Sequence, residues 1–389
     1  MAAADAFTKR AARVLSDAQP GRAEPPPLSD RLPRAWLFPV LVFAATWLLS
    51  QAIWSGSDAI YGHAHPWAWH FLIDDGHQYL QIARRGYGID PASPAFFPLF
   101  PLLIHLTSYL TAGDYLIAGL IVTFLSGAAS AVGVWALAAR VCDRRVADRA
   151  VMLYCLFPGA MTFSMLYSDS LAVALAAAVL LALLERRWLL AGIIGAAGTA
   201  ERPSMVVLVV VSGVAALQAI WTRREWLALL APGIAPLGVL AYFFYLGRRF
   251  HNYARWFLVE RAGWQQHYDG GAATLRALVH PNLTHHQRFF YMMFVIMLVV
   301  AVVGIAVMMA AWLPLPVTLF GILPILTLVT ATRPLPILPP RYVWAAFPLF
   351  IGAAAKLPRA AYWAVLVLSA ACLIFLAAWW PHHLADAAP

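Results

Sequence analysis

Long apolar runs separated by short polar segments dominate this sequence. Runs of roughly 17 to 25 residues can cross a bilayer as helices, and the first such run covers 36–54. We expect about eleven spans, with shorter runs counted where turn residues bound them. They are 36–54, 115–139, 150–166, 171–184, 188–200, 205–221, 227–246, 289–312, 316–332, 342–355 and 360–380. The pattern predicts an all-α polytopic membrane protein.

Positive charge indicates which turns face the cytoplasm. Lys and Arg gather after alternate spans, as the positive-inside bias produces. The clusters are Arg140, Arg144, Arg145 and Arg149; Arg186 and Arg187; Arg223 and Arg224; and Lys356 with Arg359. This alternation requires that 96–112 does not cross the membrane. Because Pro98 and Pro101 interrupt that segment, we expect a re-entrant or interfacial element there.

Composition supports the same class of protein. Hydrophobic residues make up 62% of the chain and charged residues 12%, which excludes a soluble globule. The net charge of +9 is spread among short loops, so membrane topology explains it and nucleic acid does not. The three cysteines lack metal or disulfide spacing. We expect a disordered cytoplasmic tail at 1–34, a transmembrane domain at 35–381 and a C-terminal tail at 382–389.

The first outer loop, 55–114, contains the most informative segment; a second large outer loop is expected at 247–288. Two adjacent carboxylates, Asp74 and Asp75, precede apolar residues at helical spacing, which predicts an amphipathic interfacial helix that ends at Gly86. Asp75 lies at its N-terminus. A carboxylate at such a position either caps the helix or takes part in chemistry, and composition alone leaves both readings open.

This segment resembles the first luminal loop of the PIG-V family, GPI mannosyltransferase 2 and its bacterial relatives, which are multispanning GT-C glycosyltransferases. The matching residues are Asp75-Gly76, Leu80, Ile82-Ala83, Gly86-Tyr87, Ala95-Phe96-Phe97-Pro98 and Pro101. Further similarity lies in Tyr167-Ser168-Asp169-Ser170-Leu171, Arg202-Pro203, Arg261-Ala262-Gly263-Trp264, Pro340-Arg341-Tyr342 and Phe347-Pro348. The resemblance extends from about Trp67 onward. It departs at Asp74, where the family usually has Trp.

The resemblance implies an inverting enzyme that transfers mannose from polyprenyl-phosphate-mannose to an acceptor hydroxyl on the extracytoplasmic side. The acceptor is a glycolipid, a polysaccharide or a protein, and the bacterial cytoplasmic membrane is the expected location. Asp75 is the expected general base, because the attacking hydroxyl must lose its proton. Asp74 is a second catalytic candidate, which either raises the pKa of Asp75 by like-charge repulsion or orients the acceptor.

Cationic and aromatic residues at the outer ends of spans are candidates for substrate binding. Arg202 and Arg341 are placed to bind the departing lipid phosphate, with Arg84 as an alternative. Asp169 begins a span, where it either caps a helix or binds substrate. Trp264 either stacks on a sugar or belongs to an interfacial aromatic belt. The set of substrate-binding candidates is completed by Tyr167, His77 and Tyr342.

We expect no cofactor and no metal. The pairs His63 with His65 and His285 with His286 lack a carboxylate at metal-site spacing. The expected partners are the lipid-linked donor, the bilayer and the acceptor, and no nucleic acid. A GT-C enzyme with another polyprenyl-phosphate sugar is the near alternative, and a lipid or solute transporter is the alternative from another class. Ionisable residues at span ends, rather than mid-membrane, favour the enzyme.

Overall fold

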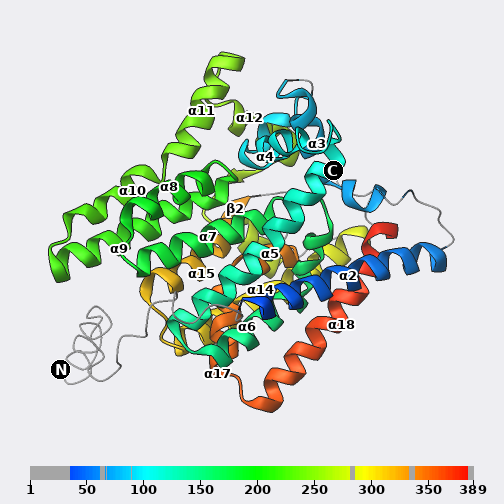
Figure 1. The fold of residues 1–389 in the computed structure, drawn as a ribbon. Coiled ribbons are helices and arrows are strands. Elements are labelled where there is room, and N and C mark those ends of the chain that lie inside the picture. Colours follow the sequence, from blue (N-terminus) through cyan, green and yellow to red (C-terminus); the bar gives the residue numbers. More distant parts are fainter. Residues whose placement is uncertain are drawn as a thin grey trace.

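A computed structural model describes residues 36–61, 66, 68–88, 90–280, 285–332 and 338–383 of the chain (Figure 1). Helices make up most of the described residues, turns and short irregular segments join them, and one pair of two-residue strands is present, β1 (His267–Tyr268) and β2 (Ala331–Thr332). These strands are antiparallel, with His267 opposite Thr332. The predicted all-α class is confirmed. The predicted tail at 1–34 lies outside the described residues, as do 384–389.

In the part of the chain that the structure describes, six helical stretches are long and apolar enough to cross a membrane. Each one coincides with a predicted span, although the first helix continues past its predicted end at Trp54. They are formed by α2 (Leu37–Tyr61), α5 (Tyr115–Val141), η5 (Pro203–Val206) with α9 (Val207–Arg223), η6 (Trp226–Leu229) with α10 (Leu230–Ile234) and α11 (Leu237–Phe250), α14 (His285–Ala310), and α18 (Arg359–His383).

The other predicted spans correspond to shorter helices. They are α6 (Arg144–Leu156), η4 (Pro158–Ser164), α7 (Asp169–Leu184), α8 (Trp188–Thr199), α15 (Leu315–Val329), α16 (Pro340–Ala345) and α17 (Pro348–Lys356). A bend of 108° separates η4 from α7, as in a broken span or a re-entrant loop. Proline begins η4 and α17, where its missing N–H costs no helical hydrogen bond. Among the described residues, length and composition therefore give six spans, or seven with the bent pair, where about eleven were expected.

Short helices form a cap at one end of the bundle. They are η2 (Trp69–Leu72), α3 (Asp75–Arg85), η3 (Ser93–Ala95), α4 (Leu99–Ser108), α12 (Arg255–Trp264) and α13 (Ala272–Val279). The predicted amphipathic helix is confirmed as α3, which ends at Gly86 with a φ of 75°. Helix α4 has 10 residues and rises only about 15 Å, too short to cross a bilayer. Figure 1 shows α3, α4 and α12 at the top and α17 at the bottom.

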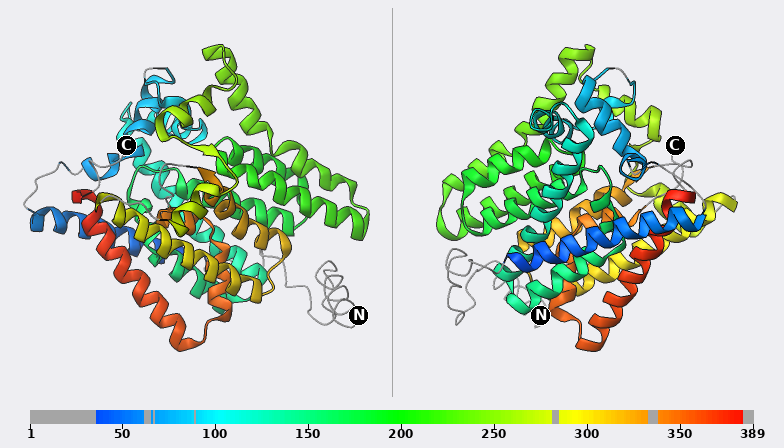
Figure 2. Two further views of the ribbon diagram at one scale, coloured as in Figure 1. Left: turned by 180° about the vertical axis from the view of Figure 1, so that it is seen from behind. Right: turned by 45° about the vertical axis from the view of Figure 1, so that its right-hand side comes forward.

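The predicted cytoplasmic arginine clusters meet in pairs on the far side of the bundle from this cap. Arg149 donates from Nη2 to the Leu357 carbonyl over 3.0 Å, which joins the first cluster to the fourth. Arg186 pairs with Glu225 at 2.6 Å, which joins the second cluster to the third. The first contact joins α6 to the residue after α17, and the second joins the turns after α7 and α9. In the left view of Figure 2 the orange-red turn that follows α17 lies at the opposite end of the molecule from the cyan and blue short helices of the cap.

Candidate active site

The two adjacent carboxylates lie at a sharp turn between η2 and α3. Asp74 has a φ of 54° and a ψ of −119°, a conformation that costs a non-glycine residue roughly 1–3 kcal/mol. Gly76 explains why the turn can be so tight, since a Cβ there would lie 2.5 Å from the Phe71 carbonyl oxygen. The turn gives Asp74 and Asp75 different neighbours.

Asp75 is the first residue of α3 and forms an ion pair across the bundle. Its Oδ2 lies 3.1 Å from Nη1 of Arg341. The two side chains keep 29% and 26% of their surfaces exposed, so the pair is open to a ligand. The Asp75 backbone N–H donates to the Tyr167 hydroxyl over 3.4 Å. The helix-capping reading of Asp75 is wrong, because Asp74 occupies the N-cap position and makes no side-chain capping bond.

Asp74 turns inward instead. Its Oδ2 accepts hydrogen bonds from Trp380 Nε1 at 3.3 Å and from the Tyr167 hydroxyl at 3.4 Å. Burial raises the pKa of Asp74 above its ordinary value, and the nearby Asp75 carboxylate adds to that rise, while the Trp380 bond and Arg341 oppose it. A raised pKa in one of two neighbouring carboxyls allows the other to stay ionised alone.

Arg341 lies between two tyrosine rings. Its guanidinium carbon is 5.0 Å from the ring centroids of both Tyr167 and Tyr342, and Nη2 donates to the Tyr342 hydroxyl over 3.4 Å. Gly159 of η4 lets α16 approach closely, because a Cβ there would lie 2.4 Å from the Trp344 Cβ and 2.7 Å from the Pro340 carbonyl oxygen. The packing of η4 on α16 therefore places Arg341 opposite Asp75.

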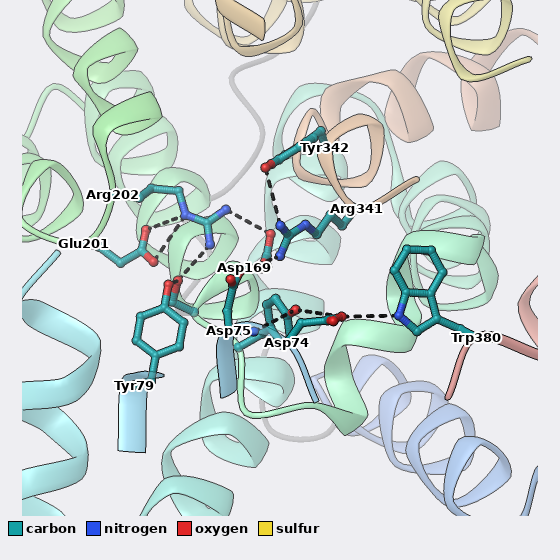
Figure 3. Close-up of polar contacts among 11 residues, drawn as sticks. Asp74, Asp75, Tyr79, Asp169, Glu201, Arg202, Arg341, Tyr342 and Trp380 are labelled. Atoms are coloured by element: carbon teal, nitrogen blue, oxygen red, sulfur yellow. Dashed lines mark hydrogen bonds and ion pairs between the residues drawn. The ribbon is translucent and has the colours of Figure 1, made fainter. Parts of the chain in front are cut away.

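Arg202 forms a second, more deeply buried network (Figure 3). Its guanidinium contacts Asp169 Oδ1 at 2.9 Å, the Ser168 hydroxyl at 2.8 Å and Glu201 Oε2 at 3.1 Å. The Tyr79 hydroxyl of α3 lies 2.8 Å from the same Ser168 hydroxyl. Burial raises the pKa of Glu201 to about 7, although Arg202 and Ser168 oppose that rise. This network connects α3, α7 and the start of η5.

Asp169 stands between the two arginines in Figure 3. It is the first residue of α7, and Ser168 at the N-cap makes no side-chain capping bond. Its carboxylate is 1% exposed and bonds Arg202 through Oδ1, while Oδ2 has no hydrogen-bond partner among the described residues. The capping reading of Asp169 is therefore wrong, and its side chain links the two arginine networks.

The structure brings together most, but not all, of the predicted site residues. Asp74, Asp75, Asp169, Arg202, Arg341, Tyr167 and Tyr342 share one region. His77 and Arg84 lie on the exposed face of α3, where His77 contacts Gln81. Trp264 packs edge-to-face on Phe96, with ring centroids 6.1 Å apart. These three residues lie outside the ion-pair networks.

Sequence reasoning missed Trp380 and the part played by Tyr79. Trp380 belongs to a pair of tryptophans at the end of the last apolar run, which looks like an interfacial belt and gives no sign of a partner. Tyr79 was recognisable as part of the apolar face of α3, but its hydroxyl bond to Ser168 depends on the fold. Within the described part of the chain, no three His, Cys, Asp or Glu side chains gather as a metal site. His63 and His65 lie outside the described residues.

Comparisons with known proteins give limited further information. No family model matches the chain, and no curated protein matches it in sequence. The oligosaccharyltransferase of Archaeoglobus fulgidus is similar in its apo structure, with 14% identity and a TM-score of 0.45 over 90% of this chain and 55% of that one. Its structure tethered to an acceptor peptide is similar over 89% and 55%, with 14% identity and a TM-score of 0.42. The chain spans about half the length of these structures.

Proposed function

We propose that this protein is a membrane-embedded, inverting glycosyltransferase of the GT-C type. The observation that carries the proposal is the partly exposed Asp75 carboxylate held 3.1 Å from Arg341, beside a second, partly buried carboxyl at Asp74. A base and a cation at one open site are the two groups that sugar transfer from a lipid phosphate needs. The site lies at the ends of helices and not in the middle of the bundle. The ends of membrane-spanning helices are at the depth where lipid phosphates reside.

Asp75 accepts the proton of the acceptor hydroxyl as its oxygen attacks the anomeric carbon of the donor sugar. The bond between that carbon and the phosphate oxygen breaks, and its electron pair leaves with the polyprenyl phosphate. A single displacement inverts the anomeric centre, so a β-linked donor gives an α-linked product. Asp74, with its raised pKa, is neutral more readily than an ordinary aspartate, which limits the negative charge beside the incoming phosphate.

Arg341 is the proposed phosphate ligand. Its Nη1 pairs with Asp75 and its Nη2 with the Tyr342 hydroxyl, its side chain keeps 26% of its surface exposed, and charge-assisted bonds from arginine suit a phosphate. Arg202 is less available, since its donors already serve Asp169, Ser168 and Glu201. We therefore assign Arg202 and the buried Asp169 to positioning α3 and Arg341 rather than to contact with the donor.

The donor sugar is proposed as mannose, carried on a polyprenyl phosphate. This part rests on the resemblance of Asp75-Gly76 and the residues that follow to the PIG-V first loop. The extracytoplasmic face of a bacterial cytoplasmic membrane is the proposed place of reaction, with the arginine clusters on the cytoplasmic side. A phosphate monoester leaving group carries less charge than a diphosphate, so arginine serves without a metal.

The test is transfer of radiolabelled mannose from polyprenyl-phosphate-mannose into extracted lipids and polymer by the purified protein. General base catalysis contributes about 10²–10⁴-fold, and Asp75→Asn is expected to lose that factor while it folds normally. Asp114→Asn is the matched control, because Asp114 caps α5 by accepting from Leu116 and Ile117 and Asn caps equally well. EDTA is expected to leave the rate unchanged.

Full activity in Asp75→Asn would overturn the assignment of the base. Absence of mannose transfer by a folded wild-type protein, together with transfer from another polyprenyl-phosphate sugar, would overturn the choice of mannose and keep the reaction class. Absence of transfer from every such donor would overturn the proposed function itself.

A further inference from the structure

A cavity of about 830 Å³ lies between α2, α5 and η2, apart from the ion pairs described above. Along α2 it extends from Trp47 to Ala59, about 18 Å at the rise of an α-helix. Its α5 wall is formed by Ile117, Leu120, Ile121, Phe124 and Leu125. The cavity is elongated and is bounded by two membrane-spanning helices.

Polarity changes along the length of the cavity. Around Trp47 the walls are apolar, and Trp47 packs edge-to-face on Phe124 with centroids 5.5 Å apart. Toward the other end of α2 the lining includes Ser55, Asp58 and, from η2, His70. A ligand that fits this gradient has an apolar body and a polar end. The cavity thus matches an amphiphile rather than a small water-soluble molecule.

The cavity opens sideways toward the bilayer. Ile117, Ile121 and Leu125 of its α5 wall are all exposed on the outer surface of the bundle, where lipid chains lie. A membrane lipid can enter from that side without leaving the bilayer. The polar end of the cavity lies toward η2, which precedes the turn that carries Asp75. The head group of a lipid that enters this way is on the side of Asp75.

Charge at the polar end distinguishes this cavity from the arginine site. Asp58 Oδ1 lies 3.3 Å from His70 Nε2 and 3.7 Å from His382 Nε2, and no Lys or Arg lines the cavity. Two buried donors of lining residues, Gln51 Nε2 and Trp54 Nε1, have no acceptor among the described residues. A hydroxyl group both donates to the carboxylate and accepts from Gln51 and Trp54, whereas an ionised phosphate brings no donor for Asp58.

Two residues of the cavity wall, Trp54 and Phe71, also pack around the turn that carries Asp75. Phe71 lines the cavity, and its carbonyl oxygen is the atom against which Gly76 packs. Trp54 also lines it and belongs to a buried cluster with Ile73 and Tyr167, the tyrosine that bonds Asp74 and Asp75. The polar end of the cavity therefore adjoins Trp54 and Phe71, which pack against the surroundings of the proposed base.

We propose that this cavity binds the acceptor, and that the acceptor is a membrane lipid whose head group is uncharged and polyhydroxylated, as in a glycosyl diacylglycerol. The proposal rests on the proposed function, since it divides two substrates between two sites. The lipid phosphate of the donor binds at Arg341, and the hydroxyl-bearing acceptor lies along α2 with its polar end at Asp58.

The test uses two photoreactive lipids, glucosyl diacylglycerol and phosphatidic acid, which carry the same diazirine-labelled chain. Each is added to the full-length protein in phosphatidylcholine nanodiscs without any sugar donor, and the crosslinked peptides are mapped by mass spectrometry. We expect glucosyl diacylglycerol to label α2 and α5 peptides more strongly than phosphatidic acid. Ala59→Trp, which fills the cavity, is expected to lower that labelling by about tenfold.

Ala52→Trp is the matched control, because Ala52 is an exposed residue of the same helix that does not line the cavity. Its labelling should equal that of the wild type, and Asp58→Asn should shift the preference toward phosphatidic acid. Equal labelling by both lipids, or no effect of Ala59→Trp, would overturn the proposal. Because labelling needs no donor, selective labelling without transfer would refute only the proposed function, and transfer without selective labelling would refute only the acceptor assignment.

Discussion

Asp74 and Asp75 are consecutive residues with different surroundings. Asp75 faces Arg341 and is partly exposed, while Asp74 faces Trp380 and Tyr167 and is more deeply enclosed. The strained backbone at Asp74 separates them, since a φ of 54° turns consecutive side chains apart. One carboxylate is available as a base, and the other supports the turn that presents it.

Glu201 supplies a pH-dependent contribution to stability. The folded state raises its pKa from 4.5 to about 7, so the folded chain holds this proton more tightly than the unfolded chain does. The contribution is fully present below about pH 4.5 and is lost as the pH rises through about 7, with a magnitude of up to about 3 kcal/mol.

Glu201→Gln keeps the shape of the protonated side chain and cannot lose the proton. We expect its melting temperature in detergent to fall less than that of the wild type between pH 5 and pH 8, which bracket the pKa of about 7. Parallel pH profiles for the two proteins would show that Glu201 keeps an ordinary pKa in the fold.

Some residues of the site were predictable from the sequence because they are charged and adjoin apolar runs. Asp75, Arg202 and Arg341 are ionisable residues at the ends of apolar runs, where burial without a partner is costly. Their pairing was not predictable, since Asp75 and Arg341 are 266 residues apart. The capping readings of Asp75 and Asp169 were wrong because tertiary ion pairs competed successfully for both carboxylates.

Helix α18 contributes to the site through its final turns. Trp380→Phe is expected to lower stability by about 1–2 kcal/mol, because it removes a donor to a buried carboxyl, and to raise the Asp74 pKa further because that bond opposes the rise. Trp363→Phe is the control, since Trp363 is a half-exposed residue of the same helix. Thermal unfolding in one detergent compares them, and equal melting temperatures would exclude a role for the Trp380 N–H.

The close contact of η4 with α16 can be tested by filling the space at Gly159. Gly159→Ala would place a methyl group 2.4 Å from the Trp344 Cβ, and overpacking of this kind costs about 1–3 kcal/mol. Because α16 carries Arg341, transfer activity should fall together with stability. Gly213→Ala in α9 meets no atom within 4 Å and should be neutral or stabilising. Equal behaviour of the two variants would contradict the packing described.

Elements were predictable where one local signal was strong. The apolar face of α3 and its ending at Gly86 follow from spacing and from the glycine conformation. Span boundaries near prolines were less predictable, because Pro158 and Pro348 begin new helices within apolar runs. Hydrophobicity alone does not distinguish one long helix from two short ones.

For the whole molecule, the site and the arginine clusters lie at opposite ends of the bundle. Cysteines introduced at Tyr109 and at Arg145, which α5 separates, are expected to react from opposite sides of sealed vesicles with a membrane-impermeant maleimide. The background carries Cys142→Ser, Cys155→Ala and Cys372→Ser. Labelling of both positions from one side would refute the orientation and place α5 elsewhere than across the bilayer.

The contacts made by α18 also determine when, during synthesis, the acidic turn can be completed. Trp380 bonds Asp74 at 3.3 Å, and His382 lies 3.0 Å from the Ser57 hydroxyl, so the first outer loop is completed by residues made some three hundred positions later. A nascent chain with its early helices already inserted lacks these donors. Its acidic turn therefore acquires these contacts only after α18 has been made, so the early helices can insert well before the surroundings of Asp74 are complete.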